Sequence, residues 1–276
     1  MPKYAQCYDS QSCIRCFSCM VNCGVENRVR LHRDKNRPVE KTVQEKLPHL
    51  FHLNPRAVEI GSYPNARRVT GFHHCRHCEK APCAQICPSG AIVTRPGGSV
   101  VILENLCIGC QSCKDACPYD VPVYSRDRNK TYKCHQCHDR IENGLKQSCV
   151  TACPTGALFS GSPEEVFKEA VQRAENYTKT TGVKYAVYGG DQVNFYVGKL
   201  GWMTIAPVND SEAYLLPSNP YKPWNVLRDV AKTGGSIVAV AALAGVGYHF
   251  MNWLKKRQQI QDSSSQNDVK GGDSHE

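Results

Sequence analysis

Short apolar runs next to turns predict several strands in the chain before residue 234. Residues 3–9 (Lys-Tyr-Ala-Gln-Cys-Tyr-Asp) predict a short strand. The run Ala91-Ile-Val-Thr, the turn Pro96-Gly-Gly and the run Val100-Val-Ile-Leu predict a hairpin of two strands. Ala157-Leu-Phe repeats the first half of that hairpin, but no second strand follows it. The strand at 3–9 is therefore expected to complete this second hairpin.

One helix start is well marked. Ser162-Pro-Glu-Glu165 is a capping box with proline at the first helical position, which predicts a helix to about Tyr177. Short strands are expected near 185–188 and 194–197, and residues 207–224, with four prolines, are linker-like.

Residues 24–74 show no helical or strand period and carry ten Lys/Arg against five Asp/Glu. This insertion is either a solvated irregular excursion or a docking surface for a partner subunit.

The segment from Gly234 to Leu254 has 21 residues without a formal charge, a length that spans a bilayer. Tyr248 and Trp253 fit the interfacial belt, and basic residues 255–257 and a polar tail (residues 258–276) follow. We therefore predict a transmembrane helix at 234–254, with a buried helix of a soluble protein as the alternative. His249, near its end, is expected to lie at the interface or to contact a haem or quinone in a partner.

The chain is poor in the large apolar residues of an ordinary core, and its cysteines are the candidates to hold it together. Sixteen of its 17 cysteines form four groups of four, and Cys7, the one left over, is expected to be a small buried side chain. Disulfides are one interpretation of so many cysteines. They are typical of secreted domains, however, and the N-terminus carries no apolar signal segment, which disfavours them. The groups are Cys13-x2-Cys16-x2-Cys19-x3-Cys23, Cys75-x2-Cys78-x4-Cys83-x3-Cys87-Pro88, Cys107-x2-Cys110-x2-Cys113-x3-Cys117-Pro118 and Cys134-x2-Cys137-x11-Cys149-x3-Cys153-Pro154.

This spacing is typical of [4Fe-4S] ligation. Three cysteines of a group wrap one cluster, and the fourth reaches the neighbouring cluster in two-cluster ferredoxins. Exchanging fourth cysteines in this way predicts four [4Fe-4S] clusters, one in each of four sets. They are set A (Cys13, Cys16, Cys19, Cys153), set B (Cys134, Cys137, Cys149, Cys23), set C (Cys75, Cys78, Cys83, Cys117) and set D (Cys107, Cys110, Cys113, Cys87).

Two other interpretations use the same residues. Zinc accepts sets of four cysteines, but it does not explain three Cys-Pro steps in a ferredoxin pattern. Cys134-His-Gln-Cys137-His138 matches the attachment sequence of c-type haem, yet this choice leaves Cys149 and Cys153 without a role.

The predicted fold is α+β, with two pseudo-symmetric ferredoxin-like units and a C-terminal transmembrane helix. One unit is split (1–23 and 134–160) and wraps around the central one (75–133). The insertion (24–74), a region of helix, short strands and linker (161–233), the membrane helix (234–254) and the tail (255–276) complete the chain. The formal charge of +9 offsets about −8 from four oxidised clusters, so no nucleic acid is expected as a partner.

With these groups, residues 1–200 resemble the four-cluster iron–sulfur subunits of the dimethyl sulfoxide reductase superfamily, and the C-terminal anchor resembles the β subunit of membrane-bound formate dehydrogenase. The hydrogenase-2 iron–sulfur subunit is similar, whereas the soluble relatives of polysulfide reductase lack the anchor. The resemblance implies two partners, a molybdenum or tungsten pterin catalytic subunit and an integral membrane subunit that reacts with quinone or carries cytochrome b. It also implies that sets A and B face the catalytic subunit, and that the soluble part is exported to the periplasm with a partner. A cytoplasm-facing complex is the alternative.

No nucleophile–base pair or phosphate-binding glycine loop stands out, so we expect no catalytic site. The function predicted is electron transfer by four clusters within a respiratory oxidoreductase of the formate dehydrogenase kind. A hydrogenase or sulfur-compound reductase complex and a self-standing, membrane-tethered polyferredoxin are the alternatives. Basic residues beside the cysteines are expected to raise cluster potentials, namely Arg15, Arg76, Lys114, Lys133 and Arg140.

Overall fold

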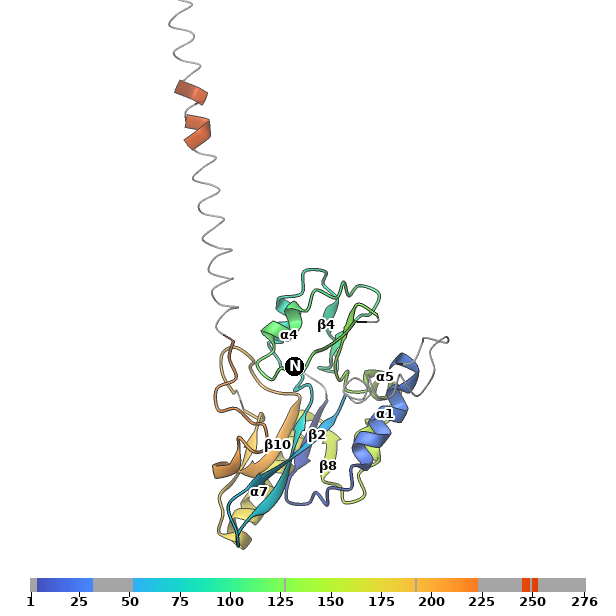
Figure 1. Ribbon diagram of the computed structural model, residues 1–276, viewed down its shortest axis with the longest axis vertical. Coiled ribbons are helices and arrows are strands. Elements are labelled where there is room, and N and C mark those ends of the chain that lie inside the picture. The colour runs from blue at the N-terminus through green and yellow to red at the C-terminus, as the bar shows by residue number, and fades with distance from the viewer. Residues whose placement is uncertain are drawn as a thin grey trace, which may run out of the picture. The chain divides into compact units, whose positions relative to one another are not determined.

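The computed structural model describes residues 4–31, 52–126, 128–191, 193–222, 245–248 and 250–252. The chain divides into two compact units, Met1–Lys222 and Pro223–Glu276. All the strands and named helices described below belong to the first unit (Figure 1).

A four-stranded sheet forms the base of the first unit, in the order β8 (Leu158–Gly161), β1 (Ala5–Asp9), β10 (Trp202–Pro207), β9 (Tyr185–Tyr188). Strand β1 pairs antiparallel with β8, with Cys7 opposite Phe159, and parallel with β10. The N-terminal strand thus completes the hairpin that begins after Cys153, as the sequence predicts. All five residues of β1 are buried because strands flank it on both sides.

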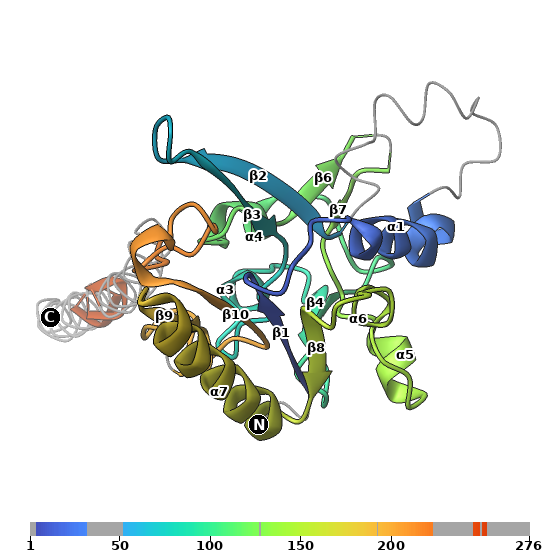
Figure 2. The ribbon, with the colours of Figure 1, turned by 90° about the horizontal axis from the view of Figure 1, so that it is seen from below.

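Helix α7 (Pro163–Thr181) packs on this sheet and contacts all four of its strands (Figure 2). Its buried residues Val166, Ala170 and Ala174 recur every four positions and pack with Cys7 and Ile205. The predicted capping box at Ser162 is present. The helix runs four residues past the predicted end because its stop signal is Gly182, a C-cap residue with φ of 70°.

Two small hairpins and five helices lie around the cysteine groups. The predicted hairpin is present as β4 (Ile92–Thr94) and β5 (Val100–Ile102), and β6 (Val123–Ser125) pairs with β7 (Lys130–Tyr132). The helices are α1 (Ser18–Leu31), α3 (Pro82–Gln85), α4 (Ser112–Ala116), α5 (His138–Glu142) and α6 (Ser148–Thr151). Each of these five helices contains or directly follows a cysteine of the four groups.

The described part of the insertion is more regular than its sequence suggests. Helix α1 extends into it to Leu31, and β2 (Asn54–Ile60) and β3 (Arg67–His73) form an antiparallel hairpin. The expectation of irregular structure is therefore wrong for 54–73. Val69 and Phe72 are buried, but exposed charged residues such as Arg56 and Arg68 interrupt the alternation of apolar and polar residues. The sequence therefore does not show the period of a strand. Residues 32–51 lie outside the described part.

Two details near the end of the unit also differ from prediction. Residues 194–197 form a turn closed by a bridge between Asn194 and Gly198, not a strand. Strand β10, which the sequence did not indicate, is buried at every position, so it has no polar alternation to mark it. The linker-like stretch begins with a 3-10 turn, η1 (Val208–Asp210).

Within the described ranges, no helix qualifies as a membrane span. The predicted span at 234–254 lies mostly outside those ranges, which contain only 245–248 and 250–252 of it, both helical.

Candidate metal centres

The same turn opens all four cysteine groups. In each Cys-x-x-Cys pair the residue before the second cysteine has a left-handed backbone, with φ of 60° at Arg15, 50° at His77, 74° at Gly109 and 59° at Gln136. Three of these residues carry a side chain, and such conformations cost energy that tertiary contacts must offset. Four equal turns at equal places in the pattern indicate four equivalent ligand loops.

Each predicted set of four thiols is brought together. In set A, Cys19 is close enough for Cys13, Cys16 and Cys153 to act electrostatically on its thiol. In set B, Cys23 acts on Cys134 and Cys149, and Cys137 acts on both as well. Residues from opposite ends of the first 160 positions thus meet in both sets.

Sets C and D form in the same way. Cys78 interacts with Cys75, Cys83 and Cys117, which are the other three members of set C. Cys113 interacts with Cys107, Cys110 and Cys87, the other three of set D. In each set the fourth cysteine, which comes from another group, thus lies near three cysteines of one group.

The four sets follow one another in a row. Cys149 of set B interacts with Cys19 of set A, and Cys134 of set B interacts with Cys75 of set C. Cys83 of set C interacts in turn with Cys113 of set D. The packing agrees, since cysteines of A and B share one apolar cluster and cysteines of C and D share another. The order is A–B–C–D.

Exposure is greatest at the two ends of this row. Cys16 in set A and Cys110 in set D are the exposed cysteines, whereas those of sets B and C are buried or partly buried. Apolar side chains are also exposed beside each end. They are Ile14, Phe17 and Val21 near set A and Leu106 and Ile108 near set D.

Crowding and burial oppose charge on these thiols. Burial, with the nearby Cys13 thiol, raises the pKa of Cys19 to about 12. Burial raises the pKa of Cys134 and Cys149 well above the ordinary value, and the thiols of Cys23 and Cys137 add to it. Four thiolates can occupy such a space only when a metal centre supplies compensating positive charge.

Hydrogen-bond donors point at four of the sulfurs, three of them from within five residues and one from the distant Gln6. The backbone N–H of Gln136 donates to Cys134 Sγ (3.3 Å) and that of Leu158 to Cys153 Sγ (3.4 Å). The side-chain amides of Gln6 and Asn27 donate to Cys149 Sγ (3.7 Å) and Cys23 Sγ (3.6 Å). Donors of this kind stabilise thiolate ligands. Neither amide was a candidate from the sequence; the contact of Gln6 depends on the tertiary fold, whereas Asn27 lies one helical turn after Cys23.

The predicted basic residues divide by burial. Arg76 and Lys133 are buried, at 3% and 7% exposure. The guanidinium of Arg76 donates to Thr204 Oγ1 (3.0 Å) and lies over the ring of Tyr119. Arg140 pairs at the surface with Glu26 instead. Arg15 and Lys114 are exposed, so solvent screens their charges.

Comparison with known proteins agrees with this geometry. Residues 71–162 match the family described as a 4Fe-4S dicluster domain. The chain is 32% identical to the B subunit of sulfite dehydrogenase from Allochromatium vinosum in an alignment of 188 positions. The alignment covers 64% of this chain and 77% of that one. It belongs to the iron–sulfur subunits of the molybdopterin oxidoreductase superfamily.

Other iron–sulfur subunits of this superfamily match to different extents. The nitrate-inducible formate dehydrogenase iron–sulfur subunit of Escherichia coli is 29% identical over 90% of this chain and 84% of its own. The B chain of anaerobic dimethyl sulfoxide reductase from the same species is 44% identical over 34% of this chain. The match spans about half the length of that relative (46%).

The residues present fit the [4Fe-4S] clusters of this family. Each set offers four thiols and the repeated turn, donors reach sulfurs of sets A and B, and the buried Arg76 and Lys133 lie near the inner sets. Cys134 and Cys137 meet Cys23 and Cys149, an arrangement that the haem interpretation does not explain. Together the four predicted sets contain sixteen of the 17 cysteines and leave out only Cys7.

Proposed function

We propose that this iron–sulfur subunit conducts electrons through four [4Fe-4S] clusters, one in each of sets A to D, within a respiratory oxidoreductase complex. The observation that carries the proposal is the row A–B–C–D, exposed at its two ends and buried in its middle. When bound, each cluster accepts and returns one electron. The chain itself has no catalytic site in this proposal.

The residues of the chain have separate tasks in this function. The sixteen thiols hold the row in order, and the two ferredoxin-like units supply sets A and B and sets C and D. The donors at Gln6, Asn27, Gln136 and Leu158 stabilise the charged ligands. Burial of the inner sets excludes water and oxidants, while the exposed apolar residues beside sets A and D support docking of one partner at each end.

The partners we propose are a molybdenum or tungsten pterin catalytic subunit at set A and an integral membrane subunit, reactive with quinone or carrying cytochrome b, at set D. Formate dehydrogenase is our first choice for the complex, because that relative matches nearly the whole chain. The sulfite dehydrogenase relative makes a sulfur-compound oxidoreductase the second choice. A helix at 234–254 that anchors the chain, with the soluble part in the periplasm, belongs to the same proposal.

Elemental analysis of the complex tests the proposal. The complex is gently solubilised from membranes and purified through this subunit. Iron at about 16 per chain is expected, together with molybdenum or tungsten. Zinc at about four per chain without visible colour would contradict the cluster assignment. Nickel in place of molybdenum or tungsten would assign the chain to a hydrogenase, and a loaded chain without any partner would make it a self-standing polyferredoxin.

A ligand variant tests the assignment of one set. Cys137→Ser should remove the set B cluster and reduce iron from about 16 to about 12 per chain. Because set B lies inside the row, electron flow to quinone should also stop, while oxidation of the substrate by a soluble dye at the catalytic subunit continues. The matched control is Cys7→Ser, which changes a cysteine outside all four sets. Unchanged iron in Cys137→Ser would reject the role of this residue.

A further inference from the structure

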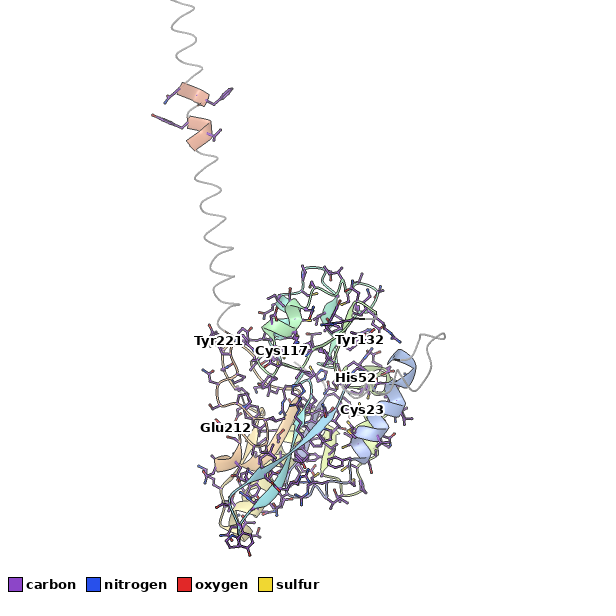
Figure 3. All side chains as sticks on the ribbon, in the orientation of Figure 1. Cys23, His52, Cys117, Tyr132, Glu212 and Tyr221 are labelled. Atoms are coloured by element: carbon purple, nitrogen blue, oxygen red, sulfur yellow. The ribbon has the colours of Figure 1, made fainter. Side chains whose placement is uncertain are left out.

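A buried lysine lies between the two inner sets of thiols. Lys133 follows β7 directly, precedes Cys134 and is 7% exposed. Its ammonium group donates hydrogen bonds to the carbonyl oxygens of Val100, on β5, and Cys134 (3.1 Å). Figure 3 labels Tyr132, the residue before it, with Cys23 from set B and Cys117 from set C. The two carbonyls fix the position of the charge.

Thiols of both inner sets surround this ammonium group. Cys75 and Cys83 of set C and Cys134 of set B are close enough to act on it electrostatically. The charge of Lys133 acts in turn on Cys78 and Cys83. Three ligands of set C and one of set B therefore interact with a single cation.

No carboxylate in the described part of the chain forms an ion pair with Lys133. A buried ammonium group without a counter-ion is costly, so its negative partners must be the thiols around it.

We propose that Lys133 is the shared counter-ion of the two inner centres, B and C, and raises the reduction potentials of both. The proposal rests on the function proposed above. Adding one electron to either centre increases the negative charge that faces the ammonium group. Since backbone carbonyls already hold that group in place, it stabilises the reduced form without moving and without taking up a proton.

Two other basic residues beside cysteine ligands, Arg76 and Lys114, do not have this position. Arg76 is buried, but the thiols that act on it, Cys78 and Cys75, belong to set C alone. Lys114 follows Cys113 of set D and is exposed. Solvent screens an exposed charge, so Lys114 supplies a matched control, a lysine beside a ligand that faces water.

The test is an anaerobic redox titration of the purified complex, followed by the electron paramagnetic resonance signals of the reduced clusters. In Lys133→Met the reduced-to-oxidised ratio of two centres should fall at least about tenfold at a fixed potential, a shift of 59 mV for one electron. The other two centres should keep their potentials. Lys133→Arg, which keeps the charge, and Lys114→Met should both resemble the wild type.

Several outcomes would overturn the proposal. Four unchanged potentials in Lys133→Met, or equal shifts in Lys133→Met and Lys133→Arg, would show that the charge is not responsible. If Lys133→Met does not assemble, Lys133→Gln keeps a hydrogen-bond donor without the charge. Loss of centres B and C in Lys133→Gln but not in Lys133→Arg supports the counter-ion role, and their loss in both variants rejects it. Fewer than four centres in the wild type would instead reject the function proposed above.

Discussion

The carboxylate of Asp9, at the end of β1, accepts a hydrogen bond of 3.1 Å from the guanidinium of Arg173 on α7. Asp9 is completely buried, and it also accepts from the hydroxyls of Ser12 (2.9 Å) and Tyr177 (2.8 Å). The backbone N–H groups of Gln11 and Ser12 complete its partners. This carboxylate therefore joins the sheet, the helix and the turn that leads to Cys13.

Replacing Arg173 by Met should destabilise the fold, because it leaves a buried carboxylate without its cation. Removing one partner of a buried pair costs roughly 3–5 kcal/mol, and we expect the lower end because Arg173 is 29% exposed. The measurement is the urea midpoint of the cluster-loaded chain under anaerobic conditions. Glu169→Gln is the control, since Glu169 also contacts Arg173 but is exposed, and it should cost less than about 1 kcal/mol. Equal losses in the two variants would argue against the role of Asp9.

Gly109→Ala should prevent set D from forming. Gly109 has φ of 74°, and a Cβ there would lie 2.4 Å from the carbonyl oxygen of Asn129. Arg15, His77 and Gln136 tolerate the same backbone conformation, so the contact with Asn129 decides the outcome. Iron should fall from about 16 to about 12 per chain. Gly97→Ala is the control because no atom lies within 4 Å of the place that its Cβ would take, and full iron in both variants would contradict the prediction.

Ser162→Ala should weaken the start of α7. Ser162 Oγ accepts from the backbone N–H of Glu165 (3.3 Å), and the Glu165 carboxylate accepts from the backbone N–H of Ser162 (3.3 Å). Loss of such a cap costs about 1 kcal/mol. Ser162→Asp keeps a side-chain acceptor and should stay near the wild type in the same urea titration. A loss in Ser162→Asp as large as in Ser162→Ala would show that capping is not the cause.

Cys7, the cysteine outside the four sets, should not react with thiol reagents while the protein is folded. Cys7 is wholly buried, and burial, with the nearby Asp9 carboxylate, raises the pKa of its thiol well above the ordinary value. With sixteen cysteines engaged as ligands, no thiol of the loaded protein should react with a thiol reagent at about pH 8. After denaturation and removal of iron, all 17 should react. Rapid reaction of one thiol in the native protein would contradict either the burial of Cys7 or the ligand assignment.

The spacing of the cysteines predicted the type of metal centre and the position of the ligand loops. Ligand loops are local, so Cys-x-x-Cys pairs and Cys-Pro steps reveal their chemistry without a fold. The hairpin at 91–103, the capping box at Ser162 and the pairing of the N-terminal strand with residues 158–161 were also predicted correctly. All of these depend on residues close in sequence or on a repeated motif.

Tertiary structure alone decided the remainder. The strand at 202–207 is buried on both faces, so its sequence does not alternate between apolar and polar residues. In the hairpin at 54–73, exposed arginines interrupt that alternation. The order A–B–C–D and the position of Lys133 between two sets depend on contacts between residues far apart in the chain. The sequence by itself predicted four sets of thiols, because the spacing of the ligands is a local pattern. Only the fold placed the sets in a row and a buried charge at its middle, because burial and long-range electrostatic contacts exist only once the chain has closed on itself.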